Sequence, residues 1–375
     1  MLMASSHAVH YICFTLATLL CAQSVTDASD IQIGRVETFI RKDVVLPHKR
    51  DGTSVIPLNF TFTFPGPHAA PLDLAKHPKL PLVLLLNGAS VESFWYRRVI
   101  GDLASKGFVV ASTDYYRPIP SGSPFKPKPG CRPQEFVEVS ARLINTLYAF
   151  VHSASGHPSA ETVFLRLADT DELLLLSHSL GGSVAFSVLT GECEGESKSG
   201  GSCEGYEPIM NSKGKDVVIG TAVFEGYLAG SGFQPREMEL KEGTFALFLS
   251  GQYNTATRKA FRGVVNQGSC ASYVSFQNMT HFGMNDFVGP SEETHQVTPC
   301  AQSTGTDDPD FTTDKATQTA GIDLIADIID AAVRLRHGSS KGLKSRLQEL
   351  VEEERVIEGD VDSDCLSGLR AAVVS

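Results

Sequence analysis

The sequence reads Leu173-Leu-Leu-Leu-Ser-His-Ser-Leu-Gly-Gly-Ser-Val-Ala185 at the point where an apolar run passes directly into a helical pattern. Such a run is typical of a β-strand that is buried on both faces. The small residues Ser177 and Gly181 stand two positions before and two positions after Ser179. This pattern predicts a tight strand-to-helix turn, in which larger flanking side chains would collide with neighbouring backbone. The turn would raise the Ser179 hydroxyl above the sheet and direct the Leu180 N–H toward an oxyanion.

Further apolar runs around this segment predict the rest of a sheet. Leu80-Pro-Leu-Val-Leu-Leu-Leu86 precedes a helical stretch that ends at Gly107, and Phe108-Val-Val-Ala-Ser-Thr113 follows it. Strand–helix–strand units in series build a doubly wound parallel sheet. We therefore expect one α/β domain over residues 25–337, with a mostly parallel doubly wound sheet flanked by helices. The other expected elements are an antiparallel strand near residues 58–64, helices near 134–154, 184–189 and 322–333, and strands near 217–224, 245–249 and 273–276.

Composition and charge exclude several classes of protein. The 375 residues are 42% hydrophobic and 20% charged, which excludes a disordered chain and a multi-span membrane protein. The net charge of −11 argues against nucleic acid or an anionic membrane surface as the main partner. The apolar run in the N-terminal region is too short for a comfortable membrane span, and no second apolar run of about 20 residues follows it. We therefore expect no stable membrane span.

The N-terminal region predicts a targeting segment. The apolar stretch Tyr11–Ala22 has the length of a signal-peptide core, and small residues follow it near Ser24. We expect residues 1–24 to be a cleaved secretory signal, which places the protein in the secretory pathway or outside the cell. An uncleaved anchor, or the first half of a bipartite plastid leader, stays open. Glycosylation sequons at Asn59 and Asn278 fit a secreted protein.

The cysteines fit an oxidising compartment. Six remain after the signal, none of them in a Cys-x-x-Cys pair, so we expect disulfides and no metal site. Six cysteines permit 15 pairings. The spacing favours the pairs Cys193–Cys203 and Cys270–Cys300, with Cys131–Cys365 as a third.

Three segments lie outside the expected sheet and the helices that flank it. Residues 117–133 are rich in proline and predict a loop. Residues 191–216 are rich in Gly, Ser, Glu and Lys, and predict a solvated surface insertion. Residues 338–375 form a charged tail, for which we expect a peripheral helix.

A serine nucleophile needs a base, and His281 is the best candidate. It stands five residues beyond Phe276, on the loop after the last expected strand of the sheet. His295 and His337 are the rivals. His178, inside the turn, is expected to point elsewhere.

The acid has two candidates. Glu225 follows Phe224 at the tip of an expected strand, and Asp286 lies on the loop of His281. We expect Glu225 to be the acid, with Asp286 as the alternative. A second oxyanion donor is expected from the loop after the first central strand, where the Ala89 N–H is the natural candidate. This set of residues needs no metal and no organic cofactor.

Three patches resemble a branch of the α/β-hydrolases that includes chlorophyllases, platelet-activating-factor acetylhydrolases and bacterial polyester hydrolases. The first patch holds Asn87-Gly-Ala-Ser90, Ser93-Phe-Trp95 and Leu103-Ala-Ser-Lys-Gly-Phe-Val-Val-Ala111. The second is the turn, which is similar to Gly-His-Ser-x-Gly-Gly with Ser177 in place of the first Gly. The third, Thr280-His-Phe-Gly-Met284, is similar to the His loop of chlorophyllases.

The resemblance spans residues 36–336 and implies an α/β-hydrolase fold and a serine carboxylic-ester hydrolase that acts through an acyl-enzyme. In the acetylhydrolases the acid stands at the strand tip where Glu225 falls, as Asp rather than Glu. The first and third patches favour a chlorophyllase-like activity, the release of phytol from chlorophyll, an apolar ester.

Two other functions stay open. The first is a secreted hydrolase of lipid, short-chain or polyester acyl esters. The second, of another class, is a catalytically inactive α/β-hydrolase used as a binding module. The departures at Ser177 and at Asn87, where the family has His, are the features that favour it.

Overall fold

The computed structural model describes residues 37–41, 58–65, 79–88, 91, 93–113, 125–127, 141–157, 162–193, 206–226, 238–251, 255–277, 279, 281, 283–284, 296–298, 301–303, 315–336 and 356–361. All of them belong to one compact unit, Ile33–Ser375. The predicted signal at residues 1–24 and the sequon at Asn278 lie outside the described residues. They stay predictions.

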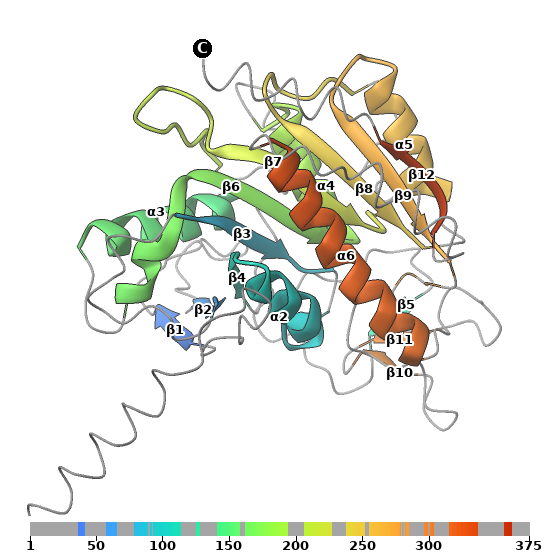
Figure 1. The fold of residues 1–375 in the computed structure, drawn as a ribbon, viewed down its shortest axis with the longest axis horizontal. Helices are drawn as coiled ribbons and strands as arrows, with labels where there is room; N and C mark the ends of the chain where they lie inside the picture. Colours follow the sequence, from blue (N-terminus) through green and yellow to red (C-terminus); the bar gives the residue numbers. More distant parts are fainter. Residues whose placement is uncertain are drawn as a thin grey trace, which may run out of the picture. The chain divides into compact units, whose positions relative to one another are not determined.

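A nine-stranded sheet runs through this unit in the order β1-β2-β4-β3-β6-β7-β8-β9-β12 (Figure 1). The six strands from β4 to β9 in this order are parallel, and β2 and β12 pair with them antiparallel on either side. This strand order, with an antiparallel β2 and with β3 and β4 exchanged, is that of the α/β-hydrolase fold. The strands are β1 (Glu37–Arg41), β2 (Leu58–Thr63), β3 (Leu80–Leu86), β4 (Val109–Thr113), β6 (Ala168–His178), β7 (Val218–Phe224), β8 (Phe245–Ser250), β9 (Ala271–Phe276) and β12 (Val356–Val361).

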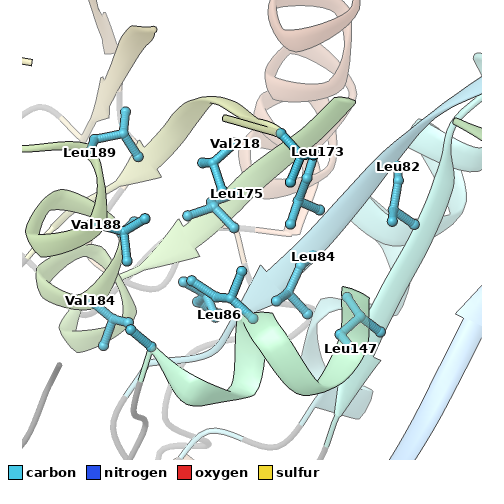
Figure 2. Packing of buried hydrophobic residues seen from close by; sticks show 14 of the residues in the cluster. Leu82, Leu84, Leu86, Leu147, Leu173, Leu175, Val184, Val188, Leu189 and Val218 are labelled. Atoms are coloured by element: carbon cyan, nitrogen blue, oxygen red, sulfur yellow. The ribbon is translucent and has the colours of Figure 1, made fainter. Parts of the chain in front are cut away.

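Helices cover both faces of the sheet, which explains why its central strands are apolar throughout. Leu82 and Leu84 of β3 pack in one hydrophobic cluster with α3 (Arg142–Gly156) and α4 (Leu180–Leu189), as Figure 2 shows. Val83 and Leu85 point to the opposite face and pack with α2 (Arg97–Ser105) and α6 (Lys315–Arg336), which lie side by side. The predicted doubly wound sheet is confirmed. No helix in the described ranges is long and apolar enough to cross a bilayer.

The smaller elements complete the fold. Helix α5 (Thr255–Val265), which the sequence analysis does not predict, packs against β8 and β9. Three short strands form a separate sheet in the order β10-β11-β5. Their bounds, with those of the two short 3-10 helices, are β5 (Phe125–Pro127), β10 (Gln296–Thr298), β11 (Ala301–Ser303), η1 (Ser93–Tyr96) and η2 (Val163–Leu167).

The expected surface insertion at 191–216 is solvated over only part of its described residues: Glu192, Glu207, Pro208, Met210 and residues 212–214 are exposed, whereas three other side chains are buried. Cys193 and Tyr206 are fully buried, and Ile209 is 7% exposed, all within the cluster that contains α3 and α4. Asn145 of α3 donates to the carbonyl of Glu207 and accepts from its N–H, which fixes this segment on the helix. The polar composition of the segment conceals apolar side chains that pack into the core.

The charged tail also differs from the expected helix. Val356–Val361 is a strand, β12, which pairs antiparallel with β9 at the edge of the main sheet. Three of its six residues are valine or isoleucine, which favour strands. The rest of the 338–375 tail lies outside the described residues.

Disulfides form at two of the predicted positions. Cys193, after α4, and Cys270, immediately before β9, are each disulfide-bonded. Their predicted partners, Cys203 and Cys300, lie outside the described residues, as do Cys131 and Cys365. The connectivity therefore stays a prediction.

Candidate active site

Ser179 occupies a strained turn between β6 and α4. Its backbone has φ 51° and ψ −119°, a conformation that is costly for a residue with a side chain. The turn is tight on both sides. A Cβ atom on Gly181 would lie 2.2 Å from the carbonyl oxygen of Leu86, and one on Gly182 would lie 2.9 Å from Val223. Glycine is therefore required where the chain approaches β3 and β7.

Ser177 takes the place of the first glycine of the usual pattern without disturbing the turn. It is fully buried, and its hydroxyl lies 3.4 Å from the hydroxyl of Thr221 on β7. The Thr221 hydroxyl in turn donates to the carbonyl of Leu175. A small polar side chain therefore fits between β6 and β7 at this position.

His281 lies beside the Ser179 hydroxyl, as the sequence analysis expects. Its Nε2 atom is 3.1 Å from the Oγ atom of Ser179, within hydrogen-bond distance. The His281 side chain is 18% exposed, so its ring lies at the boundary between protein and solvent. The rivals His295 and His337 lie outside the described residues.

Glu225 lies on the other side of the His281 ring. Its Oε2 atom is 3.6 Å from the Nδ1 atom of His281, and its side chain is 2% exposed. Glu225 follows β7 directly and has a φ of 52°, which turns the chain away from the sheet. The N–H of Gly251 donates to its Oε1 atom, so the carboxylate is held between a backbone amide and the imidazole. Asp286, the alternative acid, lies outside the described residues.

The two expected oxyanion donors are described only in part. Leu180 begins α4 and is buried, so its N–H belongs to the first turn, where backbone amides have no partner within the helix. Ala89 lies outside the described residues. Asn87, two residues before it, is fully buried and donates its side-chain amide to the carbonyls of Val91 and Thr113, each at 3.2 Å. The Asn87 side chain therefore ties the segment after β3 to the end of β4.

Tyr96 and His178 also belong to the site, and the sequence analysis missed both. The His178 ring is fully buried, 5.0 Å from the ring of His281, and its Nε2 atom lies 2.8 Å from the His281 carbonyl oxygen. The Tyr96 hydroxyl lies 2.8 Å from the Nδ1 atom of His178. Burial, and then the neighbouring His281, hold the pKa of His178 well below its usual value. The only indication in the sequence is that His178 stands directly before Ser179, and this position alone does not predict its contacts with Tyr96 and His281.

This arrangement suits nucleophilic catalysis. A hydroxyl, an imidazole and a carboxylate stand in series, in the geometry that lets the imidazole take the hydroxyl proton. Among the residues that the structure describes, no group of three or more His, Cys, Asp and Glu side chains could hold a metal ion.

No protein-family model matches the sequence, and no curated protein matches it either. Among solved structures, a Thermogutta terrifontis esterase 2 is 14% identical, with a TM-score of 0.39, over 67% of this chain and 86% of that chain. A ferulic acid esterase from Streptomyces cinnamoneus is 13% identical, with a TM-score of 0.46, over 82% of this chain and 90% of that chain. Both similarities are too low to say what this chain does. Its α/β-hydrolase fold is assigned from the strand order and from the backbone turn at Ser179.

Proposed function

We propose that this protein is a serine hydrolase that cleaves carboxylic esters through an acyl-enzyme on Ser179. One observation carries the proposal. The His281 imidazole lies between the Ser179 hydroxyl, at 3.1 Å, and the buried Glu225 carboxylate, at 3.6 Å. A Ser–His–carboxylate series on a strained strand-to-helix turn is the arrangement that acyl transfer requires.

The reaction then proceeds in two halves. The Ser179 oxygen attacks the ester carbonyl while His281 takes its proton, and the alcohol leaves with that proton. Water next attacks the acyl-enzyme and gives a proton to His281, which passes it to the Ser179 oxygen as the acid leaves. The Glu225 carboxylate holds the imidazole tautomer and stabilises the imidazolium. The Leu180 and Ala89 N–H groups are proposed to bind the oxyanion in both halves.

For the substrate we propose a bulky apolar ester, with chlorophyll as the first candidate. The support is the resemblance of Ser93-Phe-Trp95 and of Thr280-His-Phe-Gly-Met284 to chlorophyllases. A secreted hydrolase of lipid, short-chain or polyester acyl esters is the alternative from the same resemblance. We further propose that residues 1–24 direct the protein into the secretory pathway.

The test combines active-site labelling with an ester panel. The purified protein is treated with a fluorophosphonate probe, and hydrolysis is measured on chlorophyll, p-nitrophenyl esters of rising chain length and acetylated phospholipids. We expect labelling and turnover in the wild type, and neither in Ser179→Ala, because the acyl-enzyme path is gone. Ser183→Ala is the matched control, because Ser183 is buried in α4 one turn beyond the nucleophile.

The panel also separates the alternatives. Preference for chlorophyll supports the chlorophyllase-like proposal, and preference for the other esters supports the alternative. A folded protein that neither labels nor hydrolyses any ester would favour the binding module. Normal turnover by Ser179→Ala would show that the turn is only structural.

A further inference from the structure

A chain of hydrogen bonds crosses the site behind the triad. It begins at the N–H of Gly88, which donates to the Tyr96 hydroxyl at 2.9 Å. It continues from Tyr96 to the Nδ1 atom of His178, and from the Nε2 atom of His178 to the carbonyl of His281, each at 2.8 Å. Tyr96 and His178 are both fully buried. Through Tyr96 of η1 and His178 at the end of β6, the chain thus connects the segment after β3 with the segment after β9.

The donor in each bond follows from its partner. The His281 carbonyl can only accept, so the Nε2 atom of His178 carries a proton. A fully buried, neutral imidazole then leaves Nδ1 as the acceptor, and the Tyr96 hydroxyl donates to it. The Tyr96 oxygen in turn accepts from Gly88. All three bonds run in one direction, from the oxyanion loop to the base.

The ends of the chain are the two groups that must be placed against Ser179. Gly88 precedes Ala89, the expected oxyanion donor, and His281 carries the base. His178 itself is covalently joined to Ser179. A Cβ atom on Gly88 would lie 2.6 Å from Nδ1 of His178, so the loop backbone also packs directly on the ring. A shift of the ring would therefore move the oxyanion loop and the base relative to the nucleophile.

We propose that Tyr96 and His178 are positioning residues. They hold the backbone at Gly88 (the oxyanion loop) and at His281 (the base loop) in place relative to Ser179. The inference rests on the proposed function, and it adds two residues to the triad. Neither one touches the reacting atoms. They act by fixing backbone at Gly88 and at His281, and misplacement of catalytic groups by about 1 Å costs about a hundredfold in rate. A neutral His178 also adds no positive charge beside the imidazolium that forms on His281.

The first test is kinetic. Tyr96→Phe removes one hydroxyl, and His178→Gln keeps a donor for the His281 carbonyl but loses the aromatic ring acceptor. We expect Tyr96→Phe to lower kcat about ten- to a hundredfold with KM nearly unchanged, by the same positioning argument. Binding of a boronic acid, which mimics the tetrahedral intermediate on Ser179, should weaken by the same factor. The matched control is Tyr206→Phe, which removes the hydroxyl of another fully buried tyrosine, in the cluster on the opposite face of the sheet from Tyr96.

A double variant tests whether the two residues act as one chain. If they do, Tyr96→Phe with His178→Gln should cost little more than His178→Gln alone, because the bond between them is already lost. Fully additive losses would overturn the chain. If the wild-type enzyme is active and Tyr96→Phe has the same kcat and boronate affinity, the hydrogen-bond chain is also overturned. That result would leave the proposed function intact.

The second test does not depend on activity. Nitrogen-15 NMR of the histidine rings, assigned with His178→Gln, should show His178 as the neutral Nε2–H tautomer at pH values well below the ordinary histidine pKa of about 6.5. Titration of His178 near pH 6.5 would overturn the hydrogen-bond chain even if the esterase activity is confirmed. A wild type that neither labels nor hydrolyses would instead overturn the proposed function, and the catalytic role of the chain with it.

Discussion

Ser179 and Glu225 are the residues other than glycine that have a positive φ among those the structure describes. Each follows a parallel strand of the sheet directly, β6 or β7. Unfavourable backbone conformations cost about 1–3 kcal/mol each and persist where the surrounding structure enforces them. Here they turn a nucleophile and a carboxylate toward the same imidazole.

The role of Glu225 leads to a prediction at this scale. Glu225→Gln keeps the shape of the side chain but removes the charge that stabilises the imidazolium. We expect turnover to fall by roughly 10³–10⁴, by analogy with loss of the triad acid in serine proteases. Steady-state kinetics on the best ester of the panel, with thermal unfolding to check the fold, provide the measurement.

Asp286→Asn is the matched comparison for Glu225→Gln. It should cost less than about tenfold in turnover, if this carboxylate takes no part in proton transfer. The reverse order of the two losses would make Asp286 the acid and would refute the assignment of Glu225.

The sequence predicts the residues that have a local pattern. Ser179 stands between an apolar run and a helical pattern, and His281 and Glu225 each follow a strand that can be recognised from its composition. Tyr96 and His178 have no such pattern, because they bond to atoms that are 82 and 103 residues away along the chain. Hydrogen bonds to remote backbone leave no spacing for sequence analysis to detect.

At the scale of elements, α2 and α6 are joined by a line of charged side chains. Arg98 of α2 donates to Asp323 of α6 at 3.0 Å. Lys106, directly after α2, pairs with Asp327, which lies one turn beyond Asp323 on α6. Asp102 lies between them. Partial burial, and then the neighbouring Asp323, raise the pKa of Asp102 to about 6.

The raised pKa of Asp102 predicts a pH-dependent stability. Between about pH 4 and pH 6 the folded state holds a proton that the unfolded state has released. The free energy of unfolding therefore falls as the pH rises through this window. Asparagine at position 102 cannot ionise. The free energy of unfolding of Asp102→Asn, relative to that of the wild type, should therefore rise by about 1 kcal/mol between pH 4 and pH 7.5, a figure reduced for solvent screening of a partly exposed group.

Thermal unfolding at the two pH values measures the difference for Asp102→Asn. The expected gain corresponds to a change in Tm of about 1–2 °C, because the unit Ile33–Ser375 is larger than the domains of 150–250 residues in which 1 kcal/mol shifts Tm by about 2–4 °C. Asp330→Asn on α6 is the comparison, because Asp330 pairs with Arg334 of its own helix. Equal shifts at pH 4 and pH 7.5 in Asp102→Asn would contradict the raised pKa.

The predicted disulfides belong to the scale of the whole molecule. A Cys270–Cys300 bridge would close a loop that contains His281, and a loop of that length is worth on the order of 3 kcal/mol. Peptide mapping without reduction should find Cys270 joined to Cys300 and Cys193 joined to Cys203. Cys270→Ser with Cys300→Ser should lower Tm and also turnover, because the base loop is less constrained. Free thiols at Cys270 and Cys300 in the native protein would exclude this pairing.

Much of the sheet could be predicted from the sequence, because strands buried on both faces are continuous apolar runs. Three features could not. The described side chains that α5 buries are few (Thr257, Ala260, Phe261 and Val264) and stand among polar ones, and the charged residues before Val356 conceal β12. The segment with Tyr206 and Ile209 is polar on average, although both side chains lie in the core. In each case burial of a few residues outweighs the composition of the segment.

Strand β12 affects whether copies of this protein associate in solution. It covers the side of β9 that would otherwise present unpaired N–H and C=O groups. Proteolytic loss of the residues after Arg336 would uncover that edge in every copy at once. A bare strand edge is a template for pairing with a neighbouring chain, and it invites domain swapping or fibril growth. The C-terminal strand therefore helps to protect the protein against self-association as well as completing its sheet.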